Sequence, residues 1–205
     1  MDSFYALFFF NTKYKERHFF SDIAKAIGFS FINNAKIDVP TKSLLFYEKT
    51  SIEKEYALFG EYKNIPVKIF SYTYNHSGSN DHSVSNIVLE ATIKPTKMWI
   101  ILHMISFGEL IAKKEKMEKV SLEGNFNDRF DMYAREDLQR EVREIFTPDI
   151  MEKFNDISIS LNFELVDDKL YIFKMLDSEV GKEDIQNLFF VSEFVIDTLL
   201  EKLYL

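Results

Sequence analysis

The fold class is decided by the stretch ISISLNFELVDDKLYIF, which covers residues 157–173. Apolar residues occupy every second position from Ile157 to Leu165, and this is the period of a half-buried β-strand. The pair Asp167-Asp168 favours a tight turn, and apolar residues return at Leu170. Two apolar runs joined by a two-residue turn predict an antiparallel β-hairpin.

A long amphipathic helix is predicted after this hairpin, beginning at Lys182. Its apolar residues recur at the spacing of one broad helical face. They are Ile185, Leu188, Phe189, Val191, Phe194, Val195 and Leu199. The residues off that face are acidic, whereas binding to a membrane surface would require Lys or Arg there. We therefore expect the helix to pack across a sheet.

A shorter helix and a hairpin are predicted toward the N-terminus. Apolar residues from Phe19 to Ile27 share one helical face, and Gly28 stands where a glycine commonly ends a helix. Farther along, residues 56–72 alternate on either side of the turn Lys63-Asn64 and predict two paired strands. The run Phe4–Phe10 is too uniformly apolar for its period to separate a strand from a buried helix.

The middle of the chain predicts further strands. Residues 87–93 alternate between apolar and mostly polar side chains. The run from Trp99 to Ile105 is apolar on both faces, so we expect it to be covered on both sides. Two short extended pieces are expected on either side of the turn Gly124-Asn125.

Two helices are predicted between these extended pieces and the hairpin of residues 157–173. Residues 135–146 carry apolar side chains at helical spacing. Thr147-Pro148 then restarts a helix, because threonine suits the N-cap and proline suits the first helical position.

These elements predict a single α+β domain over residues 1–205, with a mainly antiparallel twisted sheet, flanking helices and a long C-terminal amphipathic helix. Residues 1–54 form its helical or extended N-terminal part. Residues 55–175 form the sheet, with helices inserted at 135–155, and residues 181–204 form the last helix. No internal repeat or low-complexity linker divides the chain.

Composition limits the kinds of function. The chain has no cysteine, which excludes disulfides, thiolate metal sites and a cysteine nucleophile. The net charge of −8 opposes attraction to phosphates, so we expect no nucleic-acid partner. The apolar runs Phe4–Phe10 and Met98–Ala112 are too short to span a bilayer. We expect a cytoplasmic protein, or one that reaches the cytoplasmic face of a membrane through a partner.

The polar loop of residues 75–83 holds the candidate metal ligands His76, Asp81 and His82. They lack a further well-placed ligand, and loop histidines are commonly just exposed. We therefore assign no metal and no cofactor, and the glycines form no phosphate-binding loop. His103 lies within an apolar strand and is interpreted as a core histidine, whereas His18 is expected to be exposed.

Carboxylates cluster between Asp128 and Glu144, but arginines interleave with them, which predicts local ion pairs. A hydrolase that uses these carboxylates or the histidine loop is one alternative for the function. We assign no catalytic residue.

Several motifs of this chain resemble an uncharacterised bacterial family known as domain of unknown function 3137. The motifs are Val120–Glu123, Phe126, Phe130, Tyr133, Asp137–Glu141, Thr147-Pro148 and Met151-Glu152. The resemblance spans roughly Tyr14 to Phe173, and it implies a fold and no activity. Family members often carry apolar helices near the N-terminus, which this chain lacks. The acidic core motif also departs from the family's pattern, since the chain reads Asp137-Leu138-Gln139-Arg140-Glu141-Val142-Arg143.

The first hypothesis for function is therefore a noncatalytic binding or interaction module, because aromatic residues make up 16% of the chain and suit a contact surface. Its partner would be a protein that the sequence does not identify. The other alternative is a binder of an apolar small ligand, held in a cavity under the C-terminal helix.

Overall fold

The computed structural model describes residues 16–33, 35, 56–75, 83–104, 116–157, 162–176 and 181–203. It confirms an α+β fold with antiparallel strand pairs. The chain divides into two compact units. The first unit holds Met1–Ile93 and Phe173–Phe189, and the second holds Lys94–Ile172 and Phe190–Leu205. That the whole chain folds as a single domain stays a prediction.

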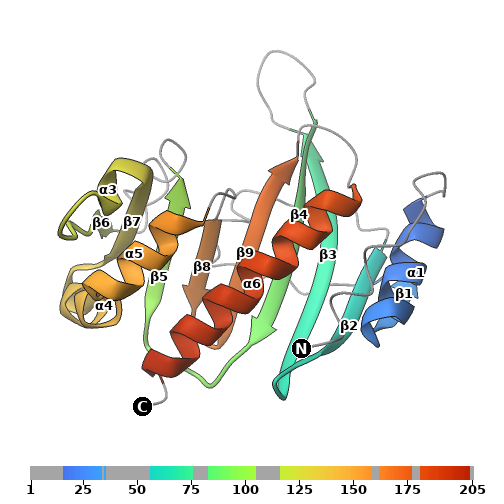
Figure 1. Ribbon diagram of the computed structural model, residues 1–205, viewed down its shortest axis with the longest axis horizontal. Coiled ribbons are helices and arrows are strands. Elements are labelled where there is room, and N and C mark those ends of the chain that lie inside the picture. The colour runs from blue at the N-terminus through green and yellow to red at the C-terminus, as the bar shows by residue number, and fades with distance from the viewer. Residues whose placement is uncertain are drawn as a thin grey trace. The chain divides into compact units, whose positions relative to one another are not determined.

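The first unit begins with helix α1, Glu16–Ile27, where the sequence predicts a helix. Gly28 ends it with a φ of +73°, a left-handed conformation that suits glycine. The amide of Phe29 then donates to the carbonyl oxygen of Ala24 at 2.7 Å. Figure 1 shows α1 beside strands β1, Ser30–Asn33, and β2, Tyr56–Tyr62.

The predicted hairpin of residues 56–72 is confirmed. Strand β2 pairs antiparallel with β3, Ile65–Asn75. Lys63 and Asn64 form the turn with φ angles of 50° and 65°, and positive φ at both positions matches the twist of a tight hairpin. Strand β4, Ser83–Thr92, pairs with β3 on its other side. The predicted alternation along β4 is incomplete, because its polar residues Asn86 and Glu90 are buried too.

The second unit is built around strand β5, Trp99–Met104. It pairs with β7, Phe130–Arg135, on one side and with β8, Asn162–Val166, on the other. Consecutive residues from Ile100 to Leu102 have no exposed surface, which confirms a strand covered on both faces. Strand β6, Met117–Lys119, pairs with β7.

Of the two extended pieces predicted around Gly124, the second is confirmed as β7, whereas the first, at Val120 and Leu122, is not a strand. Strand β6 ends before Val120, and a short helix α3, Phe126–Arg129, precedes β7. The side chain of Asn127 holds this segment. Its Oδ1 accepts from the Leu122 amide at 2.8 Å, and its Nδ2 donates to the carbonyl oxygens of Val120 and Phe130.

The two predicted helices are confirmed as α4, Gln139–Ile145, and α5, Pro148–Asp156. A 3₁₀ turn, Glu136–Leu138, precedes α4. Thr147 occupies the N-cap of α5, although its side chain makes no capping hydrogen bond. Phe154 on α5 packs against an aromatic cluster, with ring centroids 4.8 to 6.4 Å apart. The other members are Phe126, Phe130, Phe146, Phe163 and Phe194.

The last hairpin and the long helix are also present. β8 neighbours β9, Lys169–Leu176, across the turn at Asp167-Asp168. The alternation predicted a strand from Ile157, but Ile157 caps α5 and residues 158–161 lie outside the described part. Helix α6 runs from Lys182 to Leu203. Both β9 and α6 contribute residues to each unit. The undecided run Phe4–Phe10 is not described.

Candidate functional site

Buried polar side chains share one face of the sheet in the second unit. His103 on β5 lies directly opposite Asp131 on β7, and Ile101 lies between Tyr133 and Glu164 on the flanking strands. Residues that are opposite or two apart point to the same face of a sheet. The four polar residues therefore share the face of Ile101, and all four are buried.

An ion pair neutralises the carboxylate of this polar face. Lys119 on the edge strand β6 contacts Asp131 Oδ1 through Nζ, without the alignment of a hydrogen bond. The Lys119 side chain is half exposed, whereas that of Asp131 is 11% exposed. The lysine therefore keeps part of its stem in solvent and brings a positive charge to a largely buried carboxylate.

His103 is held in its neutral form. Burial lowers its pKa to about 4, and the negative charge of Asp131 opposes this effect by raising it. At neutral pH the imidazole carries no charge. The prediction that His103 lies in the core is confirmed, and His18 is exposed as expected.

The main interaction on this polar face is the ion pair of Lys119 and Asp131, which joins the neighbouring strands β6 and β7. A neutral imidazole beside a carboxylate resembles an acid–base pair, but Asp131 is already neutralised by Lys119. Among the residues that the structure describes, no three or more His, Asp or Glu side chains gather in a way that could hold a metal ion.

The first unit contains a second ion pair of the same kind. Lys68 on β3 and Glu90 on β4 are directly opposite, and Nζ donates to Oε1 at 3.1 Å. Glu90 is buried while Lys68 is partly exposed. A lysine on a neighbouring strand thus supplies the counter-charge in both units.

The predicted metal candidates His76, Asp81 and His82 lie outside the described residues, so their role stays a prediction. The predicted ion pairs around α4 are confirmed, since Arg135 pairs with Asp137 and Arg140 with Glu144 on the surface.

Arg129 has a role that the sequence did not indicate. Its guanidinium donates to the carbonyl oxygens of Asn155, at 2.6 Å, and of Phe154 and Ile157. These groups belong to the C-terminal end of α5, where carbonyl oxygens lack partners within the helix. Arg129 therefore caps the C-terminal end of α5. No sequence pattern predicts this role, because only the tertiary fold brings Arg129 to the end of that helix.

The largest exposed apolar side chain among the described residues lies on α6. Phe190 is 57% exposed, while its neighbours Phe189 and Val191 are buried. Asp197 and Glu201 follow it by seven and eleven residues, which is the spacing of one helical line. The exposure of Phe190 could have been predicted from the sequence, because Phe190 lies on the same side of the helix as the acidic residues and outside the apolar stripe.

Comparisons with protein-family models, curated proteins and solved structures found no match. The resemblance to domain of unknown function 3137 and the cavity under the C-terminal helix therefore stay predictions. In the described part of the chain, no helix combines the length and the apolar character needed to cross a bilayer.

Proposed function

We propose that the protein is a noncatalytic interaction module and that it contacts its partner through the outer face of α6. This outer face comprises Phe190, Glu193, Phe194, Asp197 and Glu201, which all belong to the second unit. The exposure of Phe190 carries the proposal. An exposed phenylalanine on a helix that is otherwise amphipathic is the kind of side chain that partners bury at the centre of an interface.

The position of Phe190 strengthens this proposal. Phe194 follows it by one turn and packs edge-on against Phe154, with ring centroids 4.8 Å apart. Phe194 thus packs this turn of α6 against α5, and the exposed Phe190 ring lies on a helix that is held in place. Rigid aromatic anchors bind with little loss of conformational entropy.

Two buried carboxylates of the sheet have lysine partners within the chain. Asp131 and Glu90 each lie against a lysine in an ion pair that braces neighbouring strands. Each lysine compensates a buried negative charge, and this role does not require a substrate.

Quantitative capture from an extract of the source cell tests the proposal, with the wild-type chain, Phe190→Ala and Met175→Ala as immobilised baits. Met175 is the matched control because it is an exposed apolar residue on β9, 38% exposed. We expect one protein to be enriched by the wild type and Met175→Ala and lost with Phe190→Ala. Equal enrichment by all three baits would contradict the proposal, provided that thermal unfolding shows Phe190→Ala to be folded.

A further inference from the structure

We infer that strand β1 pairs with β1 of a second copy of the chain, so that the protein forms a weak symmetric dimer. This inference goes beyond the proposed function and uses other residues than the outer face of α6. Strand β1 pairs with β2 on one side, and in the described part of the chain no strand pairs with its other side. The edge of a sheet presents backbone N–H and C=O groups to which a further strand can bind.

The edge at β1 lacks the features that prevent sheets from joining. Charged side chains, prolines and β-bulges commonly block such edges. The residues of β1 are uncharged and include no proline, and their register with β2 runs from Ser30 to Asn33 without a bulge. Strand β6 is different, although among the described strands it also pairs on one side only, because it is shorter and exposes Glu118 and Lys119. We therefore regard β6 as a protected edge and β1 as an open one.

Ile32 supplies the apolar contact at this edge. It is 46% exposed, whereas Ala57, directly opposite it on β2, has no exposed surface. Opposite residues of an antiparallel pair point to the same face of a sheet. The face of Ile32 is thus covered at β2, and Ile32 is exposed because it lies at the edge. A strand added beside β1 would cover its side chain.

The symmetry of a dimer limits the register of two β1 strands. Identical strands pair antiparallel about a two-fold axis perpendicular to the sheet, and this axis keeps each side chain on its own face. Opposite residues must then be an even number of positions apart in the sequence. An axis centred on Ile32 places Ile32 against Ile32 of the second copy, and Phe31 against its Asn33. This register covers the exposed isoleucine with another β-branched side chain, which is a favourable cross-strand pair.

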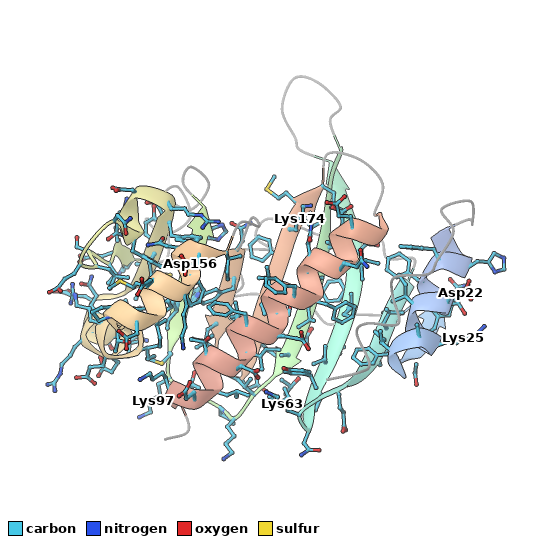
Figure 2. All side chains as sticks on the ribbon, viewed as in Figure 1. Asp22, Lys25, Lys63, Lys97, Asp156 and Lys174 are labelled. Atoms are coloured by element: carbon cyan, nitrogen blue, oxygen red, sulfur yellow. The ribbon has the colours of Figure 1, made fainter. Side chains whose placement is uncertain are left out.

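The charges near β1 favour a second copy as the occupant. Residues 16–33 contain two acidic residues, Glu16 and Asp22, and two basic ones, Arg17 and Lys25, so their formal charges cancel. Figure 2 shows Asp22 and Lys25 on α1, where Lys25 Nζ lies 3.8 Å from Asp22 Oδ1. Two copies can therefore meet at this edge without strong repulsion between like charges, although the whole chain carries a net charge of −8. A partner selected by charge would find no excess of either sign.

Sedimentation velocity of the full chain over a range of concentrations tests the inference. We expect a monomer–dimer equilibrium with a dissociation constant on the order of 10–100 µM, because two short strands form a small interface. A wild-type chain that stays monomeric at about tenfold higher concentration would overturn the inference. The edge would then be left to a strand of another protein.

Charge-matched variants locate the contact. Ile32→Lys should weaken dimerisation by about tenfold or more, because two lysines then face each other across the axis. Met175→Lys changes the net charge by the same amount at an exposed apolar residue of β9, and it should dimerise like the wild type. Phe190→Ala should also dimerise normally. Equal weakening by Ile32→Lys and Met175→Lys, or a loss of dimers with Phe190→Ala alone, would show that self-association uses another surface.

A charge exchange tests the register. Ile32→Glu should be as poor a dimer as Ile32→Lys, but an equimolar mixture of the two variants should form a heterodimer about as readily as the wild type dimerises. Opposite charges then lie across the axis, and this recovery excludes misfolding as the cause of the loss. A mixture that stays monomeric would contradict the inference. The proposed function is unaffected by that result, because capture from the extract depends on Phe190 and not on Ile32.

Discussion

Phe29 lies against Gly60 in the first unit, so closely that a Cβ atom added at Gly60 would overlap the Phe29 ring. The same ring meets Phe189 of α6 edge-on, with centroids 6.4 Å apart. Because Gly60 has no side chain, the Phe29 ring can pack directly onto strand β2.

Replacing Gly60 with alanine should lower the free energy of unfolding by about 1–3 kcal/mol, because the Phe29 ring must move away from its contacts. Urea denaturation measures this difference. The same substitution in a Phe29→Ala background should cost much less, because the obstructing ring is gone. An equal cost in both backgrounds would show that the close approach is not the cause.

Replacing Arg129 with methionine should lower the free energy of unfolding by about 2–3 kcal/mol, because carbonyl oxygens at the end of α5 lose a charged donor. Denaturation by urea again provides the measurement. Arg140→Met is the control, since Arg140 pairs with Glu144 on the surface and should cost less than about 1 kcal/mol. If the two variants were equally stable, the capping role of Arg129 would be wrong.

Local patterns predicted the elements whose shape depends on nearby residues. Gly28 marks the end of α1, Lys63-Asn64 forms the predicted turn, and α6 begins at the predicted Lys182. Helical period, turn chemistry and glycine conformation all act over a few residues, so one stretch of sequence is enough to reveal them.

The features that the sequence missed depend on partners far along the chain. Glu90 is buried because β3 places Lys68 opposite it, and the register of two strands sets that pairing. Helix α3 depends on Asn127, whose amide joins backbone groups on both sides of it. His103 lies opposite Asp131 because β5 and β7 are neighbours in the sheet. In the sequence, β6 and α3 stand between these two strands. Strand order is not visible in local periodicity.

His103 should make stability depend on pH in a mildly acidic range. Its pKa is about 4 in the folded protein, below the ordinary value of 6.5 that applies to the unfolded chain. The unfolded chain therefore binds the proton more tightly, and stability is lost as pH falls from about 6.5 toward 4. The loss across this range should be about 2–4 kcal/mol.

The measurement is the free energy of unfolding at several pH values for the wild type and His103→Gln. Carboxylates contribute to the pH dependence of both proteins, so the difference between the two isolates the contribution of His103. A His103→Gln protein with the same slope as the wild type would contradict the assignment.

The most direct test of the outer face of α6 is site-specific photo-crosslinking in the source cell. Benzoylphenylalanine replaces Phe190 in one protein, and it replaces the exposed residue Met175 in a control. We predict one discrete crosslinked product at position 190 alone, and this product should disappear when unlabelled wild-type chain competes but persist with Phe190→Ala. Crosslinks of equal yield at both positions, or competition by Phe190→Ala as strong as by the wild type, would contradict an interaction surface on α6.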